Sequence, residues 1–149
     1  MAEINRQQLI LALISAGPKP RLAGVDLSAL NMARIDLEGA NLRGANLKAA
    51  NLREGILRSA NFSYADLTVV VMDGADLANA NLTGATLLGG NLQRARFTNA
   101  NLTSAILDGA DLFGANLKGA VVTNVKYNES TTWPDGKKGS QSSPGNYTT

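Results

Sequence analysis

A bulky apolar residue recurs at every fifth position of this 149-residue chain, from Leu22 to Tyr127, without interruption. Sixteen of these twenty-two residues are Leu, and the others are Met, Phe, Val and Tyr. The residue two places earlier is Ala fourteen times and Gly twice, and the residue just before is Asn or Asp fourteen times. The consensus A-(N/D)-L-x-x is visible in residues 40–44 and 45–49. Such self-similarity is typical of a repetitive architecture.

The five-residue period excludes the two simplest regular structures. On an α-helix, five residues turn about 140° beyond one full rotation, so the Leu residues would spread around the whole circumference. On a straight strand, an odd period would place successive Leu residues on opposite faces. A path that bends at every repeat keeps each Leu on one shared axis, as in solenoid proteins. The sequence therefore predicts a coil with stacked apolar side chains.

Each position of the repeat has a physical reason in such a coil. The small residue lies where the backbone turns inward and leaves no room for a larger side chain. The Asn or Asp bonds its side chain to nearby backbone amides, as such residues do in turns. The last two positions vary and are expected to face solvent. The predicted inward column is formed by Leu22, Leu27, Met32, Leu37, Leu42, Leu47, Leu52, Leu57, Phe62, Leu67, Met72, Leu77, Leu82, Leu87, Leu92, Phe97, Leu102, Leu107, Leu112, Leu117, Val122 and Tyr127.

With this motif, the sequence resembles the pentapeptide repeat family over residues 20–129. The resemblance implies an all-β fold, a right-handed quadrilateral β-helix with four repeats to a coil and about five and a half coils. It also implies that the centres and the small residues face inward. Ser63, Thr83, Thr103 and Thr123 recur twenty residues apart, which agrees with a twenty-residue coil.

Both ends of the coil are expected to be capped, because an open end exposes the core and unpaired strand edges. Residues 1–19 are interpreted as a capping helix over about residues 3–15 with its connection, and Gly17 and Pro18 end it. Val25, Leu30 and Ile35 replace the usual Ala, as a packed cap would favour. The alternative interpretation of residues 9–16 is the apolar part of a signal peptide.

The C-terminal end is predicted from composition and from the same resemblance. Residues 130–136 resemble the closing stretch of many family members, in which an aromatic residue, here Trp133, covers the last coil. Residues 137–149 contain mostly Gly, Ser, Asn and Thr with two Lys, and they are predicted to be disordered.

Composition argues against enzyme chemistry. The chain contains neither Cys nor His, so disulfides, thiolate sites and the commonest nucleophile and base pairs are excluded. No glycine motif of a phosphate cradle is present. The isolated carboxylates of Asp26, Asp66, Asp76 and Asp111 occupy the turn-bonding position and make a poor metal site. We predict a protein that is not an enzyme and has no cofactor, no metal and no membrane span.

Charge separates the remaining functions. The resemblance raises the role of the quinolone-resistance proteins, which mimic DNA and bind gyrase with an acidic surface. A mimic needs negative charge along its whole length. Here ten basic and ten acidic residues share residues 20–129. The basic residues Arg43, Lys48, Arg53 and Arg58 form a belt on four successive sides. Gyrase mimicry and direct nucleic-acid binding are both disfavoured.

The remaining interpretation is a non-catalytic structural or protein-interaction module with an unidentified protein partner. Val69, Leu88 and Ile106 are predicted to share one side in three consecutive coils and to form an exposed apolar patch for that partner. The protein is expected to be a monomer or an end-to-end dimer. The family resemblance suggests a cyanobacterial type of protein. Its expected location is the cytoplasm, with the thylakoid lumen or periplasm as the alternative if the N-terminal segment is a signal peptide.

Overall fold

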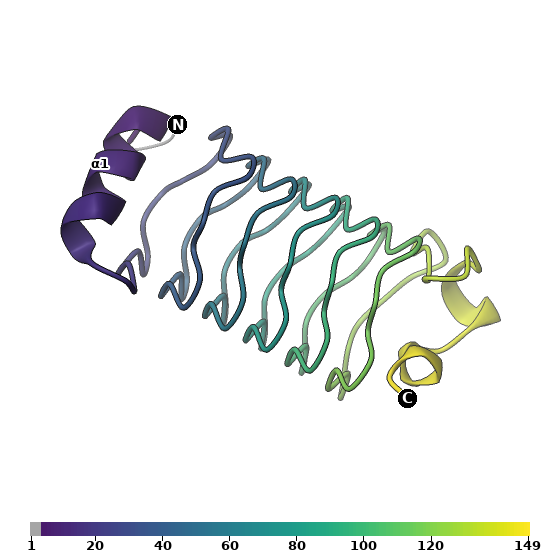
Figure 1. Ribbon diagram of the computed structural model, residues 1–149. Coiled ribbons are helices and arrows are strands. Elements are labelled where there is room, and N and C mark those ends of the chain that lie inside the picture. The colour runs from purple at the N-terminus through teal and green to yellow at the C-terminus, as the bar shows by residue number, and fades with distance from the viewer. Residues whose placement is uncertain (1–3) are drawn as a thin grey trace.

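The chain forms a rod of stacked coils with a helix at one end and a folded tail at the other (Figure 1). The computed structural model describes residues 4–149, apart from the side chain of Ile14. Helix α1 (Arg6–Ala16) comes first, and two 3-10 helices, η1 (Gly139–Gln141) and η2 (Pro144–Tyr147), follow the coils. No helix of these described residues is long and apolar enough to cross a membrane.

Parallel β-bridges set the register of the coils. Residue 21 pairs with residue 41, 26 with 46, 31 with 51 and 36 with 56, and this twenty-residue pattern repeats along the rod. In residues 4–149 the pairing consists of isolated bridges at the residue before each repeat centre, rather than of extended strands. We call the four sides A, B, C and D, starting from the repeats centred on Leu22, Leu27, Met32 and Leu37. Repeats twenty residues apart lie on the same side.

The bend in each repeat is a hydrogen-bonded turn. The amide of Ala40 donates to the carbonyl of Leu37 at 3.0 Å, and Gly39 between them has a φ of 67°. The carboxylate of Asp36 accepts from the amide of Glu38 at 3.0 Å. The backbone bond recurs along the coil, and where a repeat has Asn or Asp its side chain adds the second bond and fixes the turn. This explains the consensus at the level of single bonds.

The core runs along the rod axis as a column of repeat centres lined by Ala. The twenty centres from Leu22 to Leu117 are buried, and most have no exposed surface at all. Val122 and Tyr127 are half-buried, because they lie at the C-terminal end of the stack. Each full burial of such a side chain contributes about 1.5–3 kcal/mol. The stability of the core is therefore the sum of many similar contributions along the stack.

Helix α1 covers the N-terminal end of the rod (Figure 1). Its first turn is closed by a capping box, in which the Asn5 side chain accepts from the Gln8 amide and the Gln8 side chain accepts from the Asn5 amide. Leu9 is completely buried in the core. The helix ends at Ala16, one residue before Gly17, close to the predicted boundary. The predicted start at Glu3 lies outside the described residues.

The first coil carries the bulky lining that the cap requires. Val25 and Leu30 are half-buried and packed against the core, and Ile35 is 7% exposed. The Arg6 guanidinium donates to the carbonyl oxygens of Asn31 and Ala33. These two carbonyls face the open end of the rod, so Arg6 supplies donors that a preceding coil would otherwise provide.

One further repeat follows the last regular one, after a single inserted residue. Asp111 pairs with Thr132, twenty-one residues later instead of twenty. Trp133 consequently takes the next central position above Leu112 and is completely buried. Its Nε1 donates to the carbonyl of Gly139 at 2.7 Å. The side chain predicted as a cap thus lies inside the column.

The C-terminal tail differs from the sequence prediction. Residues 137–149 were predicted to be disordered, but η1 and η2 fold back over the last coil. Lys138 pairs with Thr132 in an antiparallel bridge. The Tyr147 ring stacks on Trp133 with 6.0 Å between ring centroids. Several contacts order the tail, among them this stacking, this bridge and the bond from Trp133 to Gly139. A prediction from composition has no means of weighing them.

Candidate interaction surface

The three apolar residues predicted as a partner patch lie on side B in three successive coils. The amide of Val69 donates to the carbonyl of Leu88 at 2.8 Å, and Ile106 is bridged to Thr86. Val69 is 49% exposed and Leu88 43%, whereas Ile106 is half-buried. We call Val69, Leu88 and Ile106 the side B patch. The register of the coil therefore places an apolar strip across three coils of one side.

The backbone of Val69 is strained. Its φ of 50° lies in the left-handed region, where a β-branched side chain is an outlier because it crowds the backbone. Twenty and forty residues later, the same corner is occupied by Gly89 and Gly109, with φ values of 61° and 67°. Glycine reaches this region without steric cost. The fold itself thus has no need of Val at position 69.

The surface beside the patch is formed by glycine and polar residues. A Cβ atom added to Gly89 would lie 3.4 Å from Cγ1 of Val69, so the Val side chain lies over this glycine. Thr68 and Thr86 are half-buried beside the patch. The carboxylate of Asp66 accepts from the amide of Thr68 at 2.9 Å and is thereby engaged in its own turn. The patch combines an apolar centre with a polar surround, as interaction surfaces do.

An exposed aromatic residue at the corner between sides A and B escaped the sequence prediction. Tyr64 is 62% exposed, and the Arg43 guanidinium lies 5.7 Å from its ring centroid. The ring covers Gly84, because a Cβ atom added there would lie 2.7 Å from ring carbons. Its counterparts Gly24 and Gly44 carry no side chain. The available signal is an aromatic residue at a position that is Gly, Ser or Asn in the other coils.

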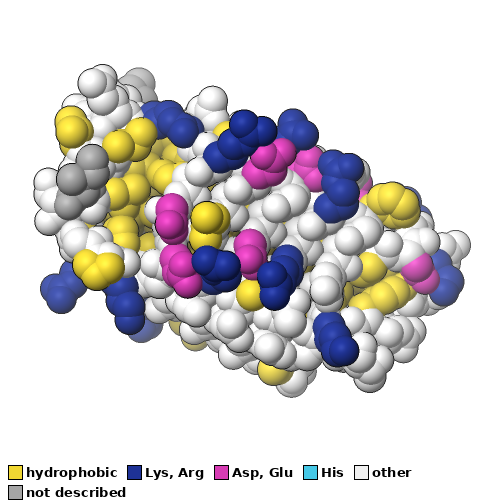
Figure 2. All heavy atoms as spheres, in the orientation of Figure 1, with side chains coloured by type: hydrophobic (Ala, Val, Ile, Leu, Met, Phe, Trp, Pro, Cys, Tyr) yellow, Lys and Arg dark blue, Asp and Glu magenta, His cyan; other side chains and the backbone are white. Residues whose placement is uncertain are grey.

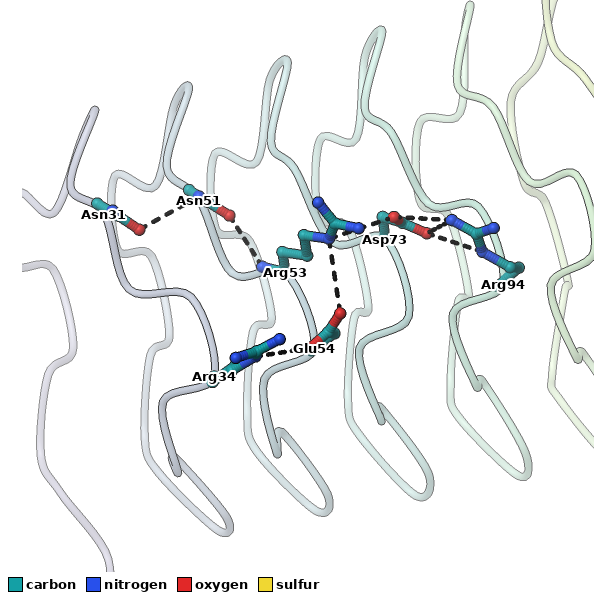
Figure 3. Close-up of polar contacts among 7 residues, drawn as sticks. All are labelled: Asn31, Arg34, Asn51, Arg53, Glu54, Asp73 and Arg94. Carbon is teal, nitrogen blue, oxygen red and sulfur yellow. Dashed lines mark hydrogen bonds and ion pairs between the residues drawn. The ribbon is translucent and has the colours of Figure 1, made fainter.

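Side C carries a chain of ion pairs across four coils (Figure 3). Arg34 pairs with Glu54 at 2.7 Å, and Arg53 lies 3.7 Å from Glu54 and 3.5 Å from Asp73. Arg94 donates three hydrogen bonds of 2.7–3.1 Å to the Asp73 carboxylate. The Asp73 side chain is only 12% exposed, which is compatible with its charge because Arg94 neutralises it.

The predicted basic belt is largely neutralised by carboxylates of neighbouring coils. On side D, Arg58 donates to Glu38 at 3.1 Å and lies 3.8 Å from Asp76. The bond to Glu38 raises the pKa of Arg58 above its ordinary value. Figure 2 shows basic and acidic side chains interspersed on the visible face. On this face neither sign forms a continuous stripe along the rod.

The turn carboxylates bind backbone amides, as their position predicted. Asp26, Asp66, Asp76 and Asp111 each accept from the amide two residues later, at 2.9–3.1 Å. Hydrogen bonds from Ser28 lower the pKa of Asp26. Among residues 4–149, no group of three His, Cys, Asp or Glu residues is arranged to hold a metal ion. These carboxylates serve the turns of the coil.

Comparison with known proteins agrees with this geometry. The family described as pentapeptide repeats matches residues 21–58, 57–88 and 85–119, in eight copies. Among solved structures, the chain is similar to the pentapeptide repeat protein Rfr23 from the cyanobacterium Cyanothece 51142, with 28% identity and a TM-score of 0.79. This likeness covers 84% of the chain and 99% of Rfr23. No curated protein sequence matches the chain.

Two other solved structures are similar over shorter ranges. HetL from Nostoc sp. strain PCC 7120, described as involved in the regulation of heterocyst differentiation, is 34% identical with a TM-score of 0.43. That match covers 79% of the chain and 61% of HetL. QnrB1, a plasmid-mediated fluoroquinolone resistance protein, is 17% identical with a TM-score of 0.43, covering 72% of the chain and 62% of its own. These two superpose too loosely to support a functional comparison.

The family match spans most of the chain, and the twenty-residue register of the bridges agrees with it. The structural likeness to Rfr23 extends over nearly the whole of that protein. The chain therefore belongs to the pentapeptide repeat family, whose members form right-handed quadrilateral β-helices.

Proposed function

We propose that the protein is a non-catalytic interaction module that binds a partner protein through the side B patch. The scaffold in this proposal is a right-handed β-helix of about five and a half coils, whose stack holds the patch rigid. The observation that carries the proposal is Val69, a β-branched residue held exposed in the left-handed region. Strain of this kind costs on the order of 1–3 kcal/mol and tends to occur at functional sites.

The neighbouring residues support the same proposal. Leu88 is an exposed apolar residue directly bonded through its backbone to Val69. Its counterparts on side B are Ser28, Lys48, Thr68 and Asp108, all of them polar. In adjacent coils, Leu88 thus departs from the polar residues of its position, and Val69 departs from the small residues, Ala and Gly, that occupy its own from residue 29 to residue 109. A small apolar patch on a rigid surface suits a partner that offers an apolar side chain.

DNA mimicry is the alternative function, and the ionic contacts argue against it. A mimic must present carboxylates whose charge is not cancelled. Here Glu38, Glu54 and Asp73 each pair with an arginine at 2.7–3.1 Å. The acidic groups of sides C and D are thereby screened by their own neighbours. Binding to gyrase would have to break these pairs.

The test is affinity capture with the purified protein, followed by measurement of the captured partner's affinity for variants. Leu88→Glu and Val69→Asn change the patch, and Lys118→Gln changes the charge by one unit on side D as a control. We expect the two patch variants to weaken binding about fivefold to thirtyfold, since an apolar contact at an interface centre is worth about 1–2 kcal/mol. If all three variants bind the partner equally well, the side B patch is not the binding surface.

A gyrase supercoiling assay distinguishes the alternative. We expect no inhibition at protein concentrations comparable to the enzyme. Inhibition that weakens with added salt would instead favour DNA mimicry, because charge-driven binding is screened.

A further inference from the structure

A groove between the first two coils of side C lies close to helix α1 and has a volume of about 370 Å³. Its chemistry is that of hydrogen-bond donors, with two arginines, two asparagines and one carboxylate in its wall. The side B patch lies on a different side of the coil, so the groove is a separate feature. The residues lining it are Asn31, Ala33, Arg34, Asn51, Arg53 and Glu54.

Two guanidinium groups converge on one carboxylate in this groove (Figure 3). Nε of Arg34 lies 2.7 Å from Oε2 of Glu54, and Nε of Arg53 lies 3.7 Å from Oε1 of the same carboxylate. The Arg34 side chain is 78% exposed, that of Arg53 56% and that of Glu54 43%. Solvent and dissolved ions therefore have access to the place where Glu54 sits between the arginines.

Arg53 is the least committed of the arginines in this network. Its contacts with Glu54 and Asp73, at 3.7 and 3.5 Å, are ion pairs longer than an ordinary hydrogen bond. The Asp73 carboxylate instead accepts three hydrogen bonds from Arg94. Within residues 4–149, the Arg53 guanidinium donates no hydrogen bond to another side chain. A guanidinium fork with unused donors suits an oxyanion.

The backbone around Arg53 holds its side chain at the groove. The amide of Arg53 donates to Oδ1 of Asn51 at 3.0 Å, and Nδ2 of Asn51 donates to Oδ1 of Asn31 at 3.2 Å. Figure 3 shows this path of bonds running from Asn31 to Arg53 along side C. The path fixes the backbone from which the Arg53 side chain extends, and that side chain is 56% exposed.

The charge of the groove is positive. Two arginines face the single carboxylate of Glu54, and the Arg6 guanidinium adds a third positive charge where it contacts the carbonyls of Asn31 and Ala33. On side D at the same level, the Glu38 carboxylate is paired with Arg58 at 3.1 Å.

We propose that this groove binds a phosphate monoester group between Arg34 and Arg53, and that Glu54 occupies the phosphate position in the free protein. A phosphate monoester carries about −1.5 to −2 charges and three acceptor oxygens at neutral pH. It offers each arginine a bidentate partner that a shared Glu54 side chain does not. A carboxylate ligand would match the charge of Glu54 and gain little by displacing it.

The test is an NMR titration with inorganic phosphate and phenyl phosphate at constant ionic strength, following the Nε–H signals of Arg34 and Arg53. Acetate at the same ionic strength is the carboxylate arm. We expect saturable shifts with both phosphates and weak, unsaturated shifts with acetate. Glu54→Gln should tighten phosphate binding about tenfold, because it removes a competing anion while keeping the side chain's shape. Arg53→Ala and Arg34→Ala should each abolish saturation.

Glu38→Gln is the matched control, because Glu38 pairs at 3.1 Å with a single arginine, Arg58, on the adjoining side. It should leave phosphate binding unchanged. Thermal melting of each variant establishes that it is folded, and Arg53→Lys keeps the charge while losing the fork. The proposal is overturned if neither wild type nor Glu54→Gln saturates, or if Glu38→Gln tightens binding as much as Glu54→Gln. Unchanged binding in Arg53→Ala would overturn it as well.

Discussion

The hydroxyl of Tyr147 donates to Oδ1 of Asp135 at 2.8 Å and so fastens the end of the chain to the turn that follows Trp133. The hydroxyl also lies 2.7 Å from Oγ of Ser142, and the ring stacks on the Trp133 indole. Tyr147 therefore joins the tail to the core by two kinds of contact. Because Trp133 is the only tryptophan of the chain, its fluorescence reports on this cap.

Removing the Tyr147 ring should expose the indole. We expect Tyr147→Ala to shift the Trp133 emission to longer wavelength, since water then reaches a ring that is now completely buried. Tyr147→Phe keeps the stacked ring and should leave the emission close to that of wild type. Steady-state fluorescence of the two variants measures the effect. An unshifted emission from Tyr147→Ala would mean that the tail does not shield the indole in solution.

Acid should loosen the same cap. Hydrogen bonds from Lys137 and Tyr147 hold the pKa of Asp135 down to about 2. In the unfolded chain the pKa of an Asp carboxyl is about 3.9. The stabilisation of the folded state by Asp135 is therefore complete above that pH and is lost as the pH falls toward 2. We expect the tail to loosen over this window, as read by Trp133 fluorescence at constant ionic strength. Asp135→Asn should show a weaker pH dependence there.

The centre of the column should tolerate a change much less well than the exterior. Leu77 is completely buried, and Leu77→Ala should lower the free energy of unfolding by about 2–5 kcal/mol through lost burial and a residual cavity. Leu77→Asp should cost still more, because it buries an unpaired carboxylate. Lys118→Ala, at an exposed position of side D, should be nearly silent. Chemical denaturation of the three variants checks the inward register directly.

The strain at Val69 predicts a substitution that stabilises the fold. Val69→Asn should raise the free energy of unfolding by up to about 1 kcal/mol, because Asn tolerates the left-handed region better than a β-branched residue. Gly89→Val is the matched reverse change at the next residue of the same corner, where φ is 61°. It should destabilise the fold, since its Cβ would also approach Val69 at 3.4 Å. Denaturation midpoints of the pair measure both effects. A loss of stability in Val69→Asn would show that Val69 is not strained in solution.

The regular coil could be predicted from the sequence because every repeat must form the same turn and bury the same central position. The same side-chain oxygen closes a turn after Asp36 and after Asn61, and the same central position is buried at Leu42 and Leu102. Periodicity alone states which residues face inward. The period also predicts that Val69 and Leu88 lie on the same side, because this prediction requires only the number of residues per coil.

Features that depend on a single contact could not be predicted in this way. The inserted residue before Thr132 breaks the period, so Trp133 looks like a covering residue in the sequence although it fills the next central position. The order of residues 137–149 depends on Tyr147 meeting Trp133. The repeat pattern does not determine the contact of Arg43 with the Tyr64 ring or the strained backbone of Val69. It also does not determine the convergence of two arginines on Glu54, because this arises from geometry between coils.

The N-terminal end of the rod can associate with another chain if it is uncovered, because α1 covers the first coil. Deleting residues 1–16 removes Leu9 from the core and the Arg6 donors from the carbonyls of Asn31 and Ala33. The uncovered apolar lining and strand edge are a template for pairing with another chain, so we expect oligomers by light scattering. Leu9→Ala should loosen the cap and promote the same association at higher concentration, whereas Ile10→Ala, at a neighbouring residue 40% exposed, should not. A clean monomer after the deletion would contradict the capping role of α1.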